Sequence, residues 1–190
     1  MTDIDSTIVA STWTQALRPP EKLPEAADVV IIGGGIVGVS TAWFLAHQGV
    51  RVVLCEKGHI AGEQSGRNWG WVRVQGRDVR EIPMMLESLR IWDRLQQDTG
   101  EDVGFVRRGC LFTAGNDKEM RSFENWIAVA GDYGIDSRLL SATELKTLVP
   151  GSALSRAGAV YTESDGRAEP HKAAPAIARA AQRAGATVLT

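Results

Sequence analysis

The stretch Asp28-Val-Val-Ile-Ile-Gly-Gly-Gly-Ile-Val-Gly38 decides the fold, and Val52-Val-Leu-Cys-Glu56 follows it at the distance of one helix. Val29 to Ile32 is an unbroken apolar run, which is typical of a parallel strand buried on both faces. The glycines after it have the spacing of a dinucleotide-binding turn, and a helix is predicted from about Ile36 to His47. We therefore expect a strand, a glycine turn, a helix and a second strand in that order.

Three glycines of this turn have distinct expected roles. Gly33 permits a tight turn off the strand, Gly35 lets the backbone approach a pyrophosphate, and Gly38 lets the helix pack closely on the strand. The first helical turn, which begins with Ile36 and Val37, directs unpaired N–H groups and the positive end of the helix dipole toward the phosphates. The sequence therefore predicts an anion site that needs no charged side chain.

The second predicted strand, Val52 to Cys55, ends at Glu56. A carboxylate at that end of a parallel strand can accept hydrogen bonds from the hydroxyls of an adenosine ribose. Its negative charge would repel a ribose phosphate, which disfavours NADP. Glycines at this spacing also occur in purely structural loops, but strand, glycines, helix, strand and acid in order predict a bound adenine dinucleotide.

The composition is typical of a folded α/β chain. The 190 residues are 44% hydrophobic and 23% charged, with a net charge of −2. No Lys/Arg cluster offers the basic face that binds nucleic acid, so no nucleic-acid partner is expected. The longest apolar stretch, Val29 to Val39, is too short for a membrane span. The N-terminus carries Asp3 and Asp5 and no apolar core of a secretory signal, so we expect a cytoplasmic protein.

Neither the cysteines nor the histidines predict a metal site. Cys55 and Cys110 have no CxxC spacing, so both are expected to be small core residues. His47, His59 and His171 are scattered along the chain, and we assign them no chemistry.

Residues 1–27 are predicted to form a polar N-terminal arm. Pro19, Pro20 and Pro24 interrupt any helix there. Trp13 is the expected anchor of the arm, by packing in a surface groove rather than by contacting a ligand.

The loop from Gly58 to Arg73 leaves the second strand at its carboxyl end, where ligands bind in an open parallel sheet. Ser65, Arg67 and Asn68 can donate hydrogen bonds to pyrophosphate or ribose oxygens. Glycines in the loop, including Gly70, let the backbone come close to a flat ring. A solvated surface loop is the alternative, which the two tryptophans beside that glycine disfavour, since exposed indoles usually cover a surface.

With these motifs, the chain resembles the N-terminal half of the FAD-dependent amino-acid oxidase family, the group that contains D-amino acid oxidase, glycine oxidase and sarcosine oxidase. The resemblance runs from about Ala27 to the C-terminus. Besides the opening stretch, it is carried by Glu56-Lys57, Glu63-Gln-Ser-Gly-Arg-Asn-Trp-Gly70 and Asp165-Gly-Arg-Ala-Glu-Pro170. It implies FAD as the cofactor, with the loop after the acid wrapped around the flavin.

Together, the motifs and the resemblance predict which residues contact FAD. They are Gly33, Gly35, Ile36, Val37, Gly38, Glu56, Lys57, Ser65, Arg67, Asn68 and Gly70, with Trp71 near the isoalloxazine. No metal ligand is predicted among them.

The predicted fold is α/β: a Rossmann-like FAD-binding domain of the glutathione-reductase βαβ type, with the beginning of an α+β substrate domain. We expect the FAD-binding core at 28–100, the start of the substrate or cap region at 101–160, and a return to the FAD-binding domain at 161–190. The resemblance also predicts that the chain is a fragment, or one chain of a split enzyme whose second chain supplies the missing half.

Further elements follow from periodicity, caps and breakers. Helices are predicted over Arg80–Thr99, ended by Gly100; over Asn116–Asp132, capped by Asn116 or Asp117; from a Ser141 cap with Glu144 through Leu148; and over Pro170–Gly185. Strands are predicted over Phe105–Thr113, interrupted at Gly109, over Ala159–Tyr161 and over Ala186–Thr190.

The resemblance implies an oxidoreductase that takes a hydride from the carbon beside the nitrogen of a small amine or amino acid and passes it to flavin N5, leaving an imine that hydrolyses. Arg73 is the candidate for binding a substrate carboxylate, because a guanidinium forks onto two oxygens, and a surface or phosphate-facing arginine is the competing interpretation. Two other functions stay open. One is an NAD-dependent dehydrogenase, which shares the glycine turn and Glu56, and the other is a non-catalytic nucleotide-binding module.

Overall fold

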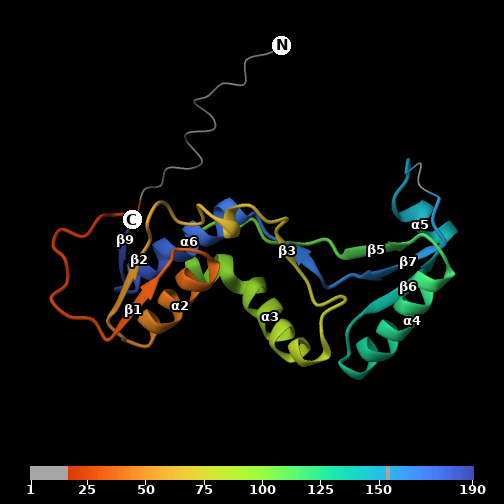
Figure 1. Ribbon diagram of the computed structural model, residues 1–190, viewed down its shortest axis with the longest axis horizontal. Helices are drawn as coiled ribbons and strands as arrows, with labels where there is room; N and C mark the ends of the chain where they lie inside the picture. Colours follow the sequence, from red (N-terminus) through yellow and green to blue (C-terminus); the bar gives the residue numbers. More distant parts are fainter. Residues whose placement is uncertain (1–16, 153–154) are drawn as a thin grey trace, which may run out of the picture. The chain divides into compact units, whose positions relative to one another are not determined.

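The computed structural model describes residues 17–152 and 155–190, so the expected anchor Trp13 lies outside the described residues. The chain divides into two compact units, whose elements Figure 1 labels. The first, which we call the parallel-sheet unit, comprises Met1–Gly70, Leu95–Gly104 and Glu169–Thr190. The second, which we call the antiparallel-sheet unit, comprises Trp71–Arg94 and Phe105–Ala168. The functional domain ranges expected from the sequence stay a prediction.

The parallel-sheet unit contains a three-stranded parallel sheet. Its strands are β1 (Val29–Ile32), β2 (Val52–Cys55) and β9 (Thr187–Leu189), in the order β1-β2-β9 (Figure 1). Helix α2 (Ile36–His47) connects β1 to β2. The bounds of β1, α2 and β2 are those that the sequence predicts, and the predicted fold class is confirmed.

The two faces of this sheet differ in what covers them. Ile31 and Leu54 lie opposite each other on the face that packs against α2, and α6 (Pro170–Arg183) packs against α2 and β9. On the other face, Val30 is 61% exposed and Ile32 is 91% exposed. The prediction that β1 is buried on both faces is therefore wrong for this chain, because the helices of the unit cover the face that Ile31 and Leu54 share.

Helices α2 and α6 pack closely because most of the side chains between them are small. In α2, Ala42 and Ala46 are buried beside Val39 and Trp43. The buried alanines of α6 are Ala173, Ala174, Ala176, Ala178, Ala180 and Ala181. Small side chains let two helix backbones approach each other closely.

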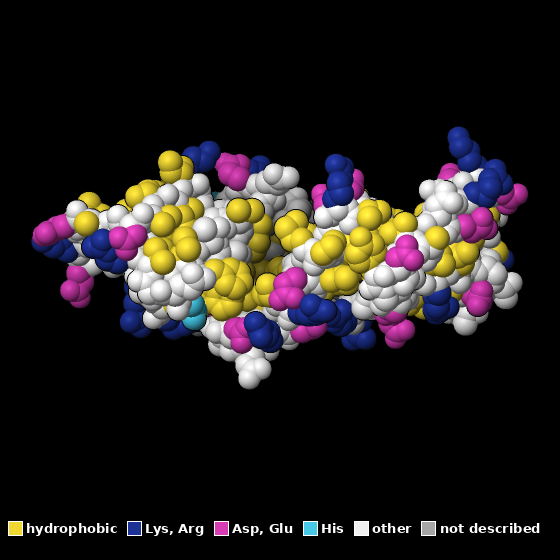
Figure 2. Space-filling view, turned by 90° about the horizontal axis from the view of Figure 1, so that it is seen from below, with side chains coloured by type: hydrophobic (Ala, Val, Ile, Leu, Met, Phe, Trp, Pro, Cys, Tyr) yellow, Lys and Arg dark blue, Asp and Glu magenta, His cyan; other side chains and the backbone are white. Residues whose placement is uncertain are grey.

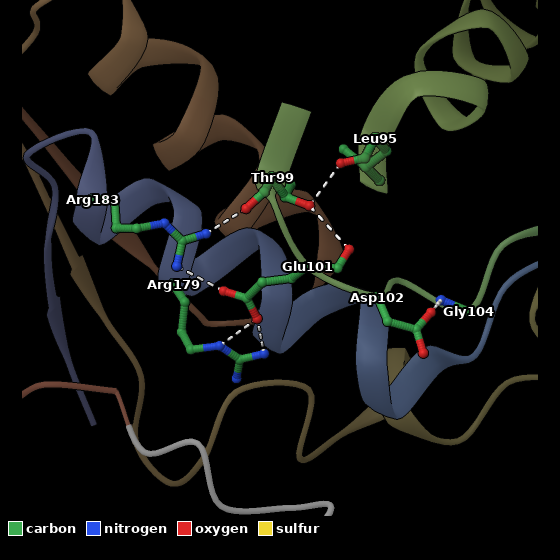
Figure 3. Close-up of polar contacts among 7 residues, drawn as sticks. All are labelled: Leu95, Thr99, Glu101, Asp102, Gly104, Arg179 and Arg183. Carbon is green, nitrogen blue, oxygen red and sulfur yellow. Dashed lines mark hydrogen bonds and ion pairs between the residues drawn. The ribbon is translucent and has the colours of Figure 1, made fainter. Parts of the chain in front are cut away.

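The segment after Thr99 is fastened to α6 by charged groups (Figure 3). The carboxylate of Glu101, whose side chain is only 14% exposed, accepts hydrogen bonds from Arg179 Nε at 2.6 Å and Arg183 Nη1 at 2.7 Å. Arg183 also donates to the Thr99 carbonyl at 2.5 Å. Burial opposes ionisation of Glu101, but the two arginines outweigh it and hold its pKa below the ordinary value. This carboxylate therefore stays ionised between two guanidinium groups.

The antiparallel-sheet unit contains two sheets of three strands. One has the order β5 (Cys110–Ala114), β7 (Gly158–Thr162), β6 (Ser137–Ser141), and the other has the order β3 (Trp71–Val72), β8 (Gly166–Arg167), β4 (Val106–Arg107). Gly109, at φ +75°, separates β4 from β5 and confirms the predicted interruption. The sequence did not predict β6, whose two adjacent leucines break any apolar alternation, nor the two-residue strands β3 and β8, the first of which lies within the stretch predicted as a loop.

Three further helices confirm their predictions. They are α3 (Ile82–Thr99), α4 (Asp117–Asp132) and α5 (Ala142–Leu148). A 3₁₀ turn, Val79–Glu81, precedes α3, which therefore begins two residues later than predicted. Asn116 caps α4, because its side-chain oxygen accepts from the Glu119 N–H at 3.0 Å.

The two cysteines differ in burial. Cys110 is 8% exposed, and burial raises the pKa of its thiol to about 11, so the prediction of a core residue is confirmed there. Cys55 is only partly buried, because it lies beside Ile32 on the uncovered face of the parallel sheet.

Across the part of the chain that the structure describes, no helix combines the length and the apolar character needed to cross a membrane. Figure 2 shows acidic and basic side chains interspersed over the face that it presents, with hydrophobic side chains exposed between them. That face therefore carries no continuous basic surface.

Asp165, between β7 and β8, holds the backbone that follows β3. Its side chain is fully buried, and its carboxylate accepts from the Val74 N–H at 2.7 Å and the Gln75 N–H at 3.1 Å. Burial raises the pKa of Asp165, while the two backbone donors oppose that rise. The sequence indicated this residue only as part of the resemblance, because its partners lie some ninety positions away.

We expect Asp165→Ala to lower the free energy of unfolding, measured by urea denaturation. The substitution leaves two buried N–H groups without an acceptor, at about 1–3 kcal/mol for each unpaired donor. Asp136→Ala is the matched control, since the Asp136 carboxylate also accepts from a backbone N–H, that of Ser164 at 2.9 Å, but does so at an exposed position where water can replace it. Equal losses in the two variants would contradict the role assigned to Asp165.

Candidate functional site

The glycine turn after β1 is built by contacts that exclude side chains. Gly33 has φ +103°, and its N–H donates to the Cys55 carbonyl at 2.8 Å. A Cβ on Gly38 would overlap the Gly33 carbonyl oxygen and lie 3.4 Å from Ile31 Cγ2. The expected steric roles of Gly33 and Gly38 are therefore confirmed. Gly34, which the motif spacing does not single out, is also restricted, because a Cβ there would lie 2.5 Å from the side chain of Ile60.

The N-terminus of α2 presents unpaired backbone donors. Gly35 is the N-cap residue and offers no side chain, and the Ile36 N–H donates to Ser65 Oγ at 2.9 Å. Within the described residues, the N–H groups of Val37 and Gly38 have no acceptor, and the first turn contains no acidic residue. Two free N–H groups at the positive end of a helix form a cradle for an anion.

Ser65 closes one side of this cradle. A Cβ on Gly35 would lie 3.0 Å from Ser65 Oγ, so a larger residue there would require the Ser65 side chain to shift. Ser65 accepts from the Ile36 N–H, and among the described residues its own O–H has no acceptor. That hydroxyl hydrogen is available to a ligand oxygen, as the prediction for Ser65 requires.

Glu56 lies at the carboxyl end of β2, as predicted, and bonds to the glycine turn. Its Oε2 accepts from the Gly34 N–H at 2.7 Å, and its Oε1 accepts from the Gly58 N–H at 2.8 Å. These bonds, that of Gly34 first, hold the pKa of Glu56 below its ordinary value. A carboxylate has about four acceptor positions. Glu56 is therefore ionised, fixed in orientation, and still able to accept from ribose hydroxyls.

The loop that follows is held by its own polar groups. The Ala61 N–H donates to the Gly34 carbonyl at 3.0 Å, which fastens the loop to the glycine turn. Asn68 Nδ2 donates to the Ser65 carbonyl at 2.8 Å, and Asn68 Oδ1 accepts from the Gly70 N–H at 2.7 Å. The side chain of Asn68 therefore shapes the loop, a role that the sequence did not reveal. Its predicted contact with FAD stays a prediction.

Lys57 and Arg67 share one acidic partner on the surface. Lys57 Nζ lies 3.3 Å from a Glu63 carboxylate oxygen, and Arg67 pairs with the other oxygen. The lysine lowers the pKa of Glu63, with a contribution from Arg67. All three side chains are well exposed, so these pairs contribute little stability. If Lys57 and Arg67 contact FAD as predicted, each would replace its ion pair with the Glu63 carboxylate by one with the pyrophosphate.

Trp71 and Arg73 belong to the antiparallel-sheet unit and form an aromatic cluster with Phe112. The guanidinium carbon of Arg73 lies 5.4 Å from the Trp71 ring centre and 5.2 Å from the Phe112 ring centre. Arg73 also donates to the Gln75 carbonyl, and burial lowers its pKa. Arg73 is thus a half-buried cation stacked on two rings and not a free surface arginine. No local pattern indicates Phe112 as a partner of Arg73, because it lies about forty residues away along the chain.

No three acidic, histidine or cysteine side chains gather to form a metal site within residues 17–152 and 155–190. The candidate site therefore consists of the backbone N–H donors of α2, the Glu56 carboxylate and the loop that follows Glu56.

Comparison with known proteins decides the family. Residues 28–190 match the family described as FAD dependent oxidoreductase. The chain belongs to this family. It is 32% identical over 186 residues to the mitochondrial sarcosine dehydrogenase of Homo sapiens, in a match that covers 94% of this chain and 20% of that protein.

Solved structures agree with this assignment. L-amino acid deaminase from Proteus myxofaciens superposes with a TM-score of 0.86 at 29% identity, over 92% of this chain and 40% of that chain. Glycine oxidase from Geobacillus kaustophilus superposes with a TM-score of 0.78 at 28% identity, over 85% of this chain and 46% of that chain. The chain thus spans less than half the length of each of these proteins.

The family confirms FAD as the cofactor, and these matches give the NAD-dependent alternative no support. The geometry of the site fits FAD. The free N–H groups of Val37 and Gly38 would hold the pyrophosphate beside the Ser65 hydroxyl, and Glu56 would hold the adenosine ribose.

We expect Glu56→Gln to raise the dissociation constant for FAD, measured by fluorescence titration. Losing hydrogen bonds to a charged acceptor costs about 1.5–3 kcal/mol. Glu25→Gln makes the same change of charge at a well-exposed position on the N-terminal arm and should leave FAD affinity unchanged. Equal dissociation constants for both variants and the parent would remove Glu56 from the site.

We expect Asn68→Ala and Arg67→Ala to raise the dissociation constant for FAD, and Asn68→Ala to do so more. Asn68→Ala removes two hydrogen bonds that shape the loop, whereas Arg67→Ala removes an exposed cation that already has a partner. The same titration measures both. If neither variant differed from the parent, the loop would be a solvated surface segment.

Proposed function

We propose that the protein containing this chain oxidises a small amine or amino acid, by removing a hydride from the carbon beside the nitrogen and leaving an imine that hydrolyses. The observation that carries the proposal is the match of residues 28–190 to the FAD dependent oxidoreductase family, combined with an anion cradle whose geometry suits a dinucleotide. Relatives named for sarcosine, glycine and L-amino acids support this substrate class.

In this proposal, FAD and the residues of this chain have different roles. Bound FAD would supply the centre that accepts the hydride, which no amino-acid side chain offers. The residues of this chain orient the cofactor: the first turn of α2 binds the pyrophosphate through backbone N–H groups, and Glu56 binds the ribose. None of these contacts requires a side chain to gain or lose a proton.

We include Arg73 in the proposal as the group that binds a substrate carboxylate. Its guanidinium is half-buried and stacked on Trp71 and Phe112, which keeps its plane fixed. A fixed guanidinium in a partly dry environment binds a carboxylate through two parallel hydrogen bonds. Within the described part of the chain, Arg73 makes one hydrogen bond, to the Gln75 carbonyl, which leaves other N–H donors available.

The first test is the identity of the bound cofactor. Heat denaturation of the purified protein should release FAD and no NAD, identified by chromatography of the extract. Release of NAD without flavin would make the protein a nicotinamide enzyme and end the proposal. Anaerobic addition of sarcosine, glycine, proline and L-amino acids to the FAD-loaded protein should then bleach the flavin with at least one of them.

We also expect residues 1–190 alone to give no turnover. The relatives extend well beyond the matched region, and holding a substrate carbon in line with its reaction partner requires a complete pocket. Mixing the FAD-loaded chain with a second chain that supplies the rest of the family fold should restore bleaching. Bleaching at an enzymatic rate by residues 1–190 without a second chain would show that this chain is sufficient.

A further inference from the structure

A small pocket lies on the α5 side of the β5-β7-β6 sheet. Its volume is about 240 Å³, about the liquid volume of eight water molecules. Leu111, Leu145 and Val149 line it with apolar surface, and Lys146 and Arg156 line it with positive charge. It therefore combines the two kinds of contact that a small amphipathic ligand needs.

This pocket is separate from the aromatic cluster of Arg73. Side chains alternate along β5, so Leu111 faces α5 while Phe112 faces the other side of the sheet. Leu111 packs with Leu145 of α5, and Phe112 packs with Trp71. The sheet itself therefore stands between the two sites, both of which belong to the antiparallel-sheet unit.

The short helix α5 fixes the position of Lys146. A capping box holds its first turn: Ser141 Oγ accepts from the Glu144 N–H at 3.3 Å, and Glu144 Oε2 accepts from the Ser141 N–H at 2.8 Å. Val149, at the C-cap of α5, lies four positions after Leu145 and three after Lys146, and all three residues line the pocket. Leu145 is buried, and the exposed Lys146 that follows it also lines the pocket.

Neither cation that lines the pocket has an acidic partner among the described residues. Arg156 is held by two neutral groups: its Nε donates to Thr113 Oγ1 at 3.3 Å and its Nη1 to the Ser155 carbonyl at 3.3 Å. Ala153 and Leu154, which are not described, carry no charge. Among residues 17–152 and 155–190, the pocket thus presents two cations without a counter-ion beside apolar side chains.

We propose that this pocket binds a small monocarboxylate with a short apolar body. The apolar body packs on Leu111, Leu145 and Val149, and the carboxylate accepts hydrogen bonds from Lys146 and from the remaining N–H groups of Arg156. This site is independent of the proposed oxidation and does not involve Arg73. In the competing interpretation, the stems of the two cations only cover apolar surface and bind nothing.

Isothermal titration calorimetry of the FAD-loaded chain with pentanoate tests the proposal, and pentanamide serves as the uncharged probe of the same size. Pentanoate should bind at least about tenfold more tightly than pentanamide, and Lys146→Met and Arg156→Met should each raise its dissociation constant by about tenfold, the loss of one charge-assisted hydrogen bond. Lys118→Met, at an exposed lysine in the first turn of α4, is the matched control and should bind like the parent. Unchanged thermal midpoints establish that the variants fold.

Ser155→Phe gives a second, steric test, because the larger side chain fills the pocket while both cations remain. It should abolish pentanoate binding. The proposal is overturned if the parent shows no binding of pentanoate, if Lys146→Met and Arg156→Met bind it like the parent, or if Arg73→Met abolishes binding and they do not. These outcomes do not depend on flavin bleaching, so failure of the proposed oxidation and failure of this site are distinguishable.

Discussion

The contact between Gly38 and the carbonyl of Gly33 is the constraint on which the cofactor site depends. Because no Cβ fits between them, α2 starts directly against the end of β1. This brings the free N–H groups of its first turn to the carboxyl edge of the sheet, where Glu56 ends β2. The hydrogen bond from the Gly34 N–H to Glu56 then ties the acid to the turn. If a side chain at position 38 pushed α2 away from β1, the N–H groups that would bind the phosphates would lie further from Glu56, which would bind the ribose.

Elements with strong local signals were predictable from the sequence. The bounds of β1, α2 and β2 follow from an apolar run and glycines, and the cap of α4 follows from Asn116 before an apolar stripe. β6 was missed because a strand of five residues with two adjacent leucines carries no periodicity. The exposure of Val30 and Ile32 on one face of β1 was also not predicted. An apolar run indicates that a strand can be buried on both faces, but it does not say whether this chain supplies both covers.

The site shows the same division between local and distant information. The spacing of Gly33, Gly38 and Glu56 was sufficient to predict their positions in the turn and at the end of β2, because apolar runs mark both strands. The bond between Ser65 and the Ile36 N–H spans 29 positions, and the stack of Arg73 on Phe112 spans more, so no local pattern announces either. The amide chemistry of Asn68 predicts a donor to the cofactor. The structure shows that the same amide also closes the loop on Gly70, which only the loop conformation reveals.

The arrangement of charge explains how a chain with a net charge of −2 is suited to a dianionic pyrophosphate. The nearest basic side chains along the loop, Lys57 and Arg67, are already paired with Glu63 on the surface. Attraction at the site must therefore come from the N–H groups and the dipole of α2, which are fixed in direction and cost no side-chain entropy when a ligand binds. A carboxylate side chain would neutralise these backbone donors only if it lay in the first turn of the helix. The first turn of α2 contains no acidic residue. In the proposed site, selectivity for a dinucleotide over a simple phosphate would rest on Glu56, an ionised group that is bonded directly to the turn.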